Sequence, residues 1–406
     1  MKNFFLLVIC SLCTCFMVGQ NVTITMLRIP DTGQNKSYTN TFGEDNDYSI
    51  NVPFYINNQN GTITDTVTGL MWQMNDGGEM TVKNAIAYCD TLALGGFKDW
   101  RLPSPHEANS ILNHQNNNPA LNTLYFTKTG AEYWWTNTRQ ANDNTKVWVT
   151  NAGGGIGNHL KSETISAGGT KKYHVRAVRD VNVPQNIQSR FVDHGDGTIT
   201  DLTTHLVWQK NLNLSSINWE DALNYAEHLE LASFNDWRLP NIKELESLND
   251  YSLVNPSIST TYFNSIGVKK YWSSTSLPNQ ITKAWYLNTQ FGITTYDEKT
   301  VLNYVICVRN ETLTTAIKNE PQANAETFIV FPNPTKGNVN IYFLEHQHEY
   351  LKVITLTNQL GQVIYRCIAD KHSDKMILDT ENVLPGFYFV TVTLGNSRKT
   401  ISVCIQ

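Results

Sequence analysis

A stretch rich in basic residues is the first part of this sequence that could do chemistry. Between His159 and Arg179 the only acidic residue is Glu163. The basic side chains of the stretch are Lys161, Lys171, Lys172, Arg176 and Arg179. Because the whole chain has a net charge of −5, this local positive patch suits a sulfated or carboxylated polymer. A solvated loop and strand face would explain the same residues.

Trp135 is a second binding candidate. The pair Tyr-Trp occurs at 133–134 and again at 271–272, but Trp135 follows the first pair and Ser273 the second. Since side chains alternate across a strand, we expect Trp135 on the face opposite its neighbour, where it could stack on a sugar ring. Packing in the core or between repeats is the alternative.

An acidic turn gives a weak metal candidate. In the sequence 193–197, Asp-His-Gly-Asp-Gly, the carboxylates of Asp193 and Asp196 are spaced as in a calcium loop. An Asp-Gly turn before a strand uses the same residues. The matching stretch 57–61 of the first repeat has no carboxylate. We therefore predict a turn, with no metal and no cofactor.

Known catalytic signatures do not occur in the sequence. It contains no His-Glu-x-x-His, no Gly-x-Ser-x-Gly and no phosphate-binding glycine loop. The glycine-rich run 153–157 follows a predicted strand without opening a helix, which indicates a loop. We therefore predict that the protein is not an enzyme.

The pentapeptide Asp-Trp-Arg-Leu-Pro occurs twice in the chain, at 99–103 and at 236–240. Ser104 or Asn241 follows it, with Glu three residues later, which is the capping-box arrangement at the start of a helix. We predict an extended segment that enters a helix, with the Trp as its buried anchor. The Asp and Arg are expected to pair with each other or to bond to the backbone.

The residues around the pentapeptide repeat as well. The copies lie 136 residues apart at Trp72 and Trp208, and 137 apart at Trp100 and Trp237, which indicates a tandem duplication. In each copy two predicted helices are followed by several short strands, and no βαβ alternation occurs. This order indicates an α+β fold.

Length and composition limit the number of domains and the classes of ligand that the chain can be expected to have. A chain of 406 residues is expected to form two or three domains. Its net negative charge argues against a general nucleic-acid or anionic-membrane binder. Residues 1–20 have the charged start and short apolar run of a secretory signal, and no later apolar stretch predicts a transmembrane helix.

The predicted domains follow from these boundaries. The first repeat carries a polar N-terminal extension, residues 21–56, that is expected to pack on it. The domains are a signal peptide at 1–20, the first repeat at 21–180, the second repeat at 186–310, a linker at 311–326 and a small all-β sandwich at 327–406.

The C-terminal sandwich resembles the type A sorting domain of the type IX secretion system. The residues that carry the resemblance are Phe-Pro-Asn-Pro-Thr at 331–335, the turn at 358–362 and Leu-Pro-Gly-Phe-Tyr at 384–388. It implies sorting-signal roles for Pro332, Asn333, Pro334, Gly361 and Gly386. It also implies the type IX secretion machinery as a partner, and a secreted or outer cell-surface location. An ordinary accessory β-sandwich is the alternative.

The two repeats resemble the Lcl C-terminal domain family. The matching segments are 30–34, 61–65 with 69–73, the two pentapeptides, 271–275 and 307–309. The family is grouped with C-type-lectin-like folds, and its best-known member binds sulfated glycosaminoglycans. The resemblance therefore implies two tandem C-type-lectin-like modules, which completes the expected fold as α+β followed by the sandwich.

The cysteines depart from this family's pattern, in which a helix cysteine faces a cysteine of the closing strand. Cys89 and Cys307 each align with an alanine of the other repeat, so each repeat keeps one half of the pair. Either both thiols are free and buried, which we favour, or a Cys89–Cys307 disulfide joins the repeats. Cys367 and Cys404 could pair within the sandwich, and their spacing does not decide.

The sequence thus predicts an exported cell-surface or secreted protein that binds an extracellular glycan or polyanionic polymer, or a ligand on a host or neighbouring cell. The predicted contacts are Lys161, Lys171, Lys172, Arg176 and Trp135. The alternative is a structural or protein–protein interaction module of a surface assembly, without glycan binding.

Overall fold

The computed structural model divides the chain into two compact units, residues 1–312 and 313–406. The described residues are 22–127, 129–165, 172–181, 183–212, 215–311, 328–332, 335, 337–343, 352–358, 362–370, 373, 375–380, 383–394 and 397–405. The predicted signal peptide lies outside them, as does the predicted linker apart from Glu311.

The predicted α+β class with C-type-lectin-like modules is wrong. Across the part of the chain that the structure describes, strand accounts for 41% and helix for 10%, with four α-helices and several sheets. The helical patterns seen in the sequence do form helices, but these have only six to ten residues. The segments between them run as strands, so the fold is mainly β.

The first repeat places two short helices between strands. Strands β2, β3, β4 and β9 form a four-stranded sheet in that order. The elements are β2 (Tyr55–Asn57), β3 (Thr62–Asp65), β4 (Leu70–Gln73), α1 (Val82–Thr91), α2 (Pro105–Ser110), β5 (Ala131–Gln140), β6 (Asp143–Asn151), β7 (Ile156–Leu160), β8 (Lys172–His174) and β9 (Val178–Asp180).

The second repeat has the same order of elements as the first, but its described residues form no counterpart of strand β8. Its four-stranded sheet has the order β11-β12-β13-β17. The elements are β11 (Phe191–Asp193), β12 (Thr198–Asp201), β13 (Leu206–Gln209), α3 (Trp219–Glu227), α4 (Ile242–Ser247), β14 (Lys270–Ser276), β15 (Lys283–Asn288), β16 (Ile293–Glu298) and β17 (Val308–Asn310).

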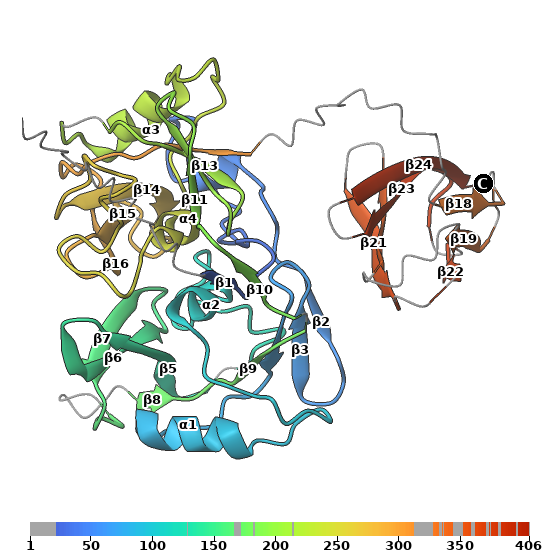
Figure 1. Ribbon diagram of the computed structural model, residues 1–406, viewed down its shortest axis with the longest axis horizontal. Helices are drawn as coiled ribbons and strands as arrows, with labels where there is room; N and C mark the ends of the chain where they lie inside the picture. Colours follow the sequence, from blue (N-terminus) through green and yellow to red (C-terminus); the bar gives the residue numbers. More distant parts are fainter. Residues whose placement is uncertain are drawn as a thin grey trace, which may run out of the picture. The chain divides into compact units, whose positions relative to one another are not determined.

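The two repeats are joined into one structure by a sheet that both of them build. Its seven strands have the order β14-β15-β16-β7-β6-β5-β8, so the edge of one repeat pairs with the edge of the other. At the junction Thr294 pairs with Ile156, whose backbone N–H donates to the Thr294 hydroxyl at 2.8 Å. Figure 1 shows α1 and α3 at opposite ends of this unit, with the shared sheet between them.

The pentapeptide is a folding element, as the sequence predicts. Trp100 and Trp237 are 3% and 1% exposed, and each indole N–H donates to a backbone carbonyl six residues earlier. The helix starts that follow are confirmed, because Ser104 and Asn241 both form capping boxes. The motif therefore fixes where each strand-like segment turns into a helix.

The Asp and Arg of the pentapeptide do not pair with each other. Asp236 forms an ion pair with Arg309 on the closing strand β17. Arg238 instead binds both carboxylate oxygens of Glu244, the capping residue of α4, at 2.6 and 2.7 Å. In the first repeat Arg101 binds Glu107 in the same way, and also Asp180 at 2.7 Å.

The N-terminal extension does more than pack on the first repeat. Its first strand, β1 (Val22–Ile24), pairs with β10 (Gln185–Ile187), the segment between the repeats. Residues 31–48, which include a 3-10 helix at Asp45–Asp47, then cross onto β14 of the second repeat. The extension thus ties both repeats together, which the sequence prediction missed.

All regular elements in the described part of the C-terminal unit are strands. Its two sheets, with orders β18-β19-β22 and β21-β20-β23-β24, share one apolar core. The strands are β18 (Phe328–Phe331), β19 (Val339–Phe343), β20 (Lys352–Asn358), β21 (Val363–Ala369), β22 (Lys375–Leu378), β23 (Gly386–Leu394) and β24 (Ser397–Ile405). Among all described residues, no helix is long and apolar enough to cross a membrane.

We predict that Glu244→Gln destabilises the first unit by about 3–5 kcal/mol, because Arg238 would remain buried without a carboxylate partner. Glu107→Gln is the matched control: Arg101 is 31% exposed and retains Asp180, so a loss of about 1–2 kcal/mol is expected. Urea unfolding followed by tryptophan fluorescence measures this unit alone, since all 10 tryptophans lie in it. Equal losses for the two variants would contradict the prediction.

Candidate functional site

The described residues of the predicted basic patch do not all lie at the surface. Lys172 is exposed and lies 3.6 Å from the Glu79 carboxylate, whereas Arg176 is only 2% exposed and points inward. Lys161 is half-buried just after β7. Lys171 lies outside the described residues. The residues are adjacent in sequence, but Arg176 belongs to the interior because its guanidinium donates to the carbonyls of Gln73 and Met74.

Of the two alternatives for Trp135, the structure has packing in the core and not an exposed ring for a sugar. Its side chain is fully buried, stacks on Tyr173 with ring centroids 4.9 Å apart, and donates to the Met80 carbonyl at 2.8 Å. Trp272 makes the matching bond to Ile217 in the second repeat. Matching residues of these two strands therefore lie 137 residues apart, one less than the spacing of the two Tyr-Trp pairs. A shift of one residue exchanges the faces of a strand, so the alignment on the Tyr-Trp pairs set Trp135 against the wrong residue.

With this register the tryptophan peculiar to the first repeat is Trp134. It occupies the place of Tyr271. Trp134 pairs in parallel with His174 and Tyr271 pairs in parallel with Tyr304, and each partner lies just before the closing strand of its repeat. Trp134 is 5% exposed and its indole N–H donates to Asp76 at 3.1 Å. The sequence comparison therefore detected the difference but assigned it to the neighbouring residue.

The weak metal candidates serve as turn residues. Asp193 accepts the Gly195 backbone N–H at 3.0 Å and pairs with Lys210. Asp196 accepts both the backbone N–H and the hydroxyl of Thr198. Within the described residues no cluster of three or more His, Cys, Asp or Glu side chains could hold a metal ion.

Neither proposed disulfide forms. Cys89 and Cys307 are free, buried thiols, and burial raises the pKa of the Cys89 thiol to about 12 and that of Cys307 further. The two residues lie in separate core clusters, one in each repeat. Cys367 is also free, so the Cys367–Cys404 bridge is not formed.

A buried polar cluster in the first repeat, centred on Asp76, is the candidate site. One Asp76 oxygen accepts from the Thr129 hydroxyl at 2.5 Å and from Trp134 Nε1. The other lies 2.9 Å from His174 Nδ1. Arg176 completes this group, which we call the Asp76 cluster, with Nη2 at 3.9 Å from the same carboxylate.

The electrostatics of the cluster keep Asp76 ionised. Burial alone would raise its pKa, but hydrogen bonds from His174 and Thr129 and the charge of Arg176 lower it. Burial also lowers the pKa of Arg176 to about 10. Arg176 Nε and His174 Nε2 are buried without a hydrogen-bond partner among the described residues. Such unpaired groups cost stability.

The second repeat replaces the whole cluster with apolar or aromatic side chains. Its counterparts of Asp76, Thr129, Trp134, His174 and Arg176 are Leu212, Ile266, Tyr271, Tyr304 and Ile306. Leu212, Ile266, Tyr271 and Ile306 are members of one hydrophobic core, and Tyr304 packs against it. The fold is therefore stable without the polar cluster.

A hollow of about 210 Å³ adjoins the Asp76 cluster, with which it shares Thr129 and Trp134. The other lining residues are Asn118, Pro119, Leu121, Thr127, Gly130, Ala131 and Glu132. The lining mixes polar groups with an aromatic ring, as small-molecule sites do, but the hollow is smaller than the roughly 300 Å³ of drug-sized sites. It suits one small polar ring.

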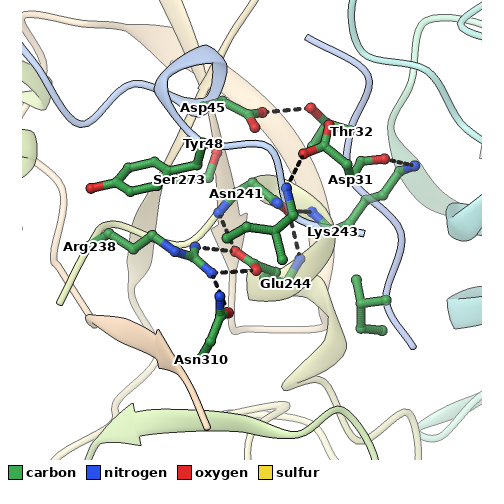
Figure 2. A network of polar contacts seen from close by, with 12 residues as sticks. Asp31, Thr32, Asp45, Tyr48, Arg238, Asn241, Lys243, Glu244, Ser273 and Asn310 are labelled. Atoms are coloured by element: carbon green, nitrogen blue, oxygen red, sulfur yellow. Dashed lines mark hydrogen bonds and ion pairs between the residues drawn. The ribbon is translucent and has the colours of Figure 1, made fainter. Parts of the chain in front are cut away.

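A second polar network, shown in Figure 2, joins the N-terminal extension to α4. Lys243 is 1% exposed and its ammonium donates to the carbonyls of Asp31 and Ser110. Asp45 accepts the hydroxyls of Thr32 and Thr275 at 2.7 and 2.6 Å. These groups find their partners within the protein, so the network is an internal joint and not a binding site.

Family comparisons support the sequence resemblances. The model of the Lcl C-terminal domain matches residues 61–179 and 197–309, which together are more than half of the chain. The chain belongs to the Lcl C-terminal domain family. The model of the secretion system C-terminal sorting domain matches residues 329–406. The protein is therefore exported by the type IX system and is secreted or held at the outer cell surface.

Other comparisons add little. A search of curated proteins finds no match. Among solved structures, dimeric latent PorU from Porphyromonas gingivalis aligns at 8% identity and a TM-score of 0.17, over 64% of this chain. The chain covers 26% of that protein. A likeness at this level carries no argument about fold or function.

The sorting-signal residues are only partly described. Gly386 begins β23 and Pro332 follows β18 directly. Asn333, Pro334 and Gly361 lie outside the described residues. The family matches, and not the geometry of these residues, therefore carry the conclusion on sorting.

Within the two Lcl C-terminal domains, sequence reasoning missed Asp76, Thr129 and His174. These residues come from three separate segments and carry no local motif. A comparison of the two repeats at the offset of the structure would have found them, because each polar residue faces an apolar or aromatic counterpart. Arg176 was singled out, but as a surface charge.

The Figure 2 network predicts a pH dependence of stability. Burial and the neighbouring Asp31 raise the pKa of Asp45 to about 7 from the usual 3.8, against the bonds from Thr275 and Thr32. As the pH rises, the unfolded state releases this proton before the folded state does. The free energy of unfolding therefore falls as the pH is raised from about 4 to about 7. We expect Asp45→Asn to flatten this fall in urea titrations at several pH values.

The exposed neighbour Asp47 provides the control for that titration. Asp47→Asn should keep the pH dependence of the parent. If Asp45→Asn and the parent lose the same stability between these pH values, Asp45 is not the responsible group.

Proposed function

We propose that this exported protein is a non-enzymatic binding protein whose first repeat holds one sugar unit of an extracellular glycan in the hollow beside the Asp76 cluster. The observation that carries the proposal is the replacement of this cluster in the second repeat. Burying polar groups costs stability, and the fold does not need them here. Proteins retain such costs mainly at functional sites.

The composition of the hollow supports a sugar as the ligand. Trp134, whose indole N–H is fixed by Asp76, lines the hollow together with Thr127, Thr129 and Glu132, whose side chains carry oxygens. A sugar ring has apolar faces and a polar edge, which matches this arrangement. None of the described basic residues of the first repeat lines the hollow, so a polyanionic polymer is not the ligand we propose.

The alternative is a structural or protein–protein interaction module of a surface assembly. It makes the Asp76 cluster a feature of the interior alone and predicts no glycan binding. A stable protein partner, captured by a chain that binds no glycan, would favour it.

We predict that Gly130→Phe abolishes binding of the full secreted chain to glycans on an array. Gly130 lines the hollow, and a Cβ added there meets nothing within 4 Å, so we expect a side chain at this position to fit without a clash and to obstruct the hollow. The melting temperature should stay at that of the parent.

Gly157→Phe is the matched control. Gly157 lies in β7 and also faces open space, but it does not line the hollow. Its glycan binding should equal that of the parent. Equal binding by Gly130→Phe would place the ligand elsewhere, and a parent that binds no glycan would overturn the proposed function.

A further inference from the structure

We propose that β2, the outermost strand of the first-repeat sheet, pairs with β2 of a second copy of this chain. The two strands would run antiparallel across a two-fold axis at Ile56 and join the two sheets into one. Since β2 contributes no residue to the hollow, this assembly is a property separate from glycan binding.

The backbone of β2 has hydrogen-bonding groups that point away from its sheet. Phe54 accepts from and Asn58 donates to the backbone on the β3 side, so the bonds to β3 lie at the even-numbered residues of this segment. The N–H and C=O groups of Tyr55 and Asn57 therefore face outward. Among the described residues no partner bonds them.

Apolar side chains lie along the same edge. Val52, Phe54 and Ile56 are 60%, 50% and 42% exposed, whereas Tyr55 belongs to the core. Phe54 and Ile56 share one face, opposite Tyr55, because successive side chains of a strand alternate. An unpaired edge flanked by exposed apolar side chains is a template for pairing with another chain.

The edge segment also lacks charge. Residues 49–60 include no Asp, Glu, Lys or Arg, although natural sheet edges commonly carry such residues to prevent association. Because each chain has a net charge of −5, two copies approach most easily through a surface without charge. An uncharged edge therefore suits a second copy of the same acidic chain.

The second repeat places a charge at the same edge. Strand β11 is the counterpart of β2 and pairs with β12 in the same register. Arg190 takes the place of Phe54 and binds Asp201, and Gln188 takes the place of Val52. The fold therefore does not need exposed apolar side chains at this position, and their presence in the first repeat points to a partner.

The outward groups of one β2 match those of another. With Ile56 opposite its own copy, Tyr55 of each chain exchanges both backbone hydrogen bonds with Asn57 of the other. The pairing ends where the donors end. Pro53 has no N–H, and the N–H of Gln59, which would lie opposite it, already donates to the Asn57 side chain. Both sides of β2 are then occupied, so the assembly closes as a dimer.

Sedimentation velocity of the full secreted chain tests the pairing. The edge is short, so we expect a concentration-dependent equilibrium in which dimer predominates at about 100 µM. Ile56→Lys sets two ammonium groups against each other on the axis and should leave only monomer. Because Ile56 is exposed, the melting temperature should stay at that of the parent.

Val192→Lys is the matched control. Val192 holds the position of Ile56 on β11 and is 39% exposed, so this variant should dimerise like the parent. A parent that stays monomeric up to that concentration, or an Ile56→Lys variant that still dimerises, would overturn the inference. Glycan binding by a monomeric parent would leave the proposed function standing.

Disulfide trapping tests the register. In a pair without mutual hydrogen bonds, opposed Cα atoms of antiparallel strands lie about 4.5 Å apart, within the range of a disulfide. Mild oxidation should therefore link two chains of Ile56→Cys through the introduced thiols, as peptide mapping would show. In Phe54→Cys the introduced thiols lie on opposite sides of the axis and should not link. Equal linking of the two variants would refute an axis at Ile56.

Discussion

The pairing of the pentapeptide arginine with the glutamate that completes the capping box of the next helix is the interaction on which both repeats depend. In the second repeat the Arg238 guanidinium holds Glu244 through two bonds while Glu244 accepts the Asn241 backbone N–H. Arg238 also exchanges backbone hydrogen bonds with Val308 of the closing strand. One charge pair thus joins the extended motif, the start of α4 and β17, and neither charge is left unpaired in the interior.

The first repeat uses the same pairing and then diverges around it. Arg101 keeps a second carboxylate, and the surrounding core holds the Asp76 cluster where the sister repeat is apolar. Duplication gave two copies of one scaffold, and one of them tolerates buried polar groups. The proposed site lies in the copy that departs from the simpler packing.

Local signals in the sequence predicted local structure well. The capping boxes at Ser104 and Asn241 and the burial of Trp100 and Trp237 follow from spacing within a few residues, and the structure has them. Properties that depend on distant segments were predicted poorly. The register that exchanges Trp134 and Trp135, the burial of Arg176 and the crossing of the N-terminal extension onto β14 all depend on tertiary contacts. The fold class was predicted wrongly because the extent of strand depends on how distant segments pair, as in the seven-stranded sheet that both repeats build.

The seven-stranded sheet makes each repeat depend on the presence of the other. Strands β7 and β16 are edges within their own repeats, and each is covered only because the other copy is present. A descendant that lost either copy would present an unpaired strand edge, which is a template for association with other chains. The duplication is therefore hard to reverse by simple deletion. This dependence allows the two copies to diverge in sequence while remaining together in one gene.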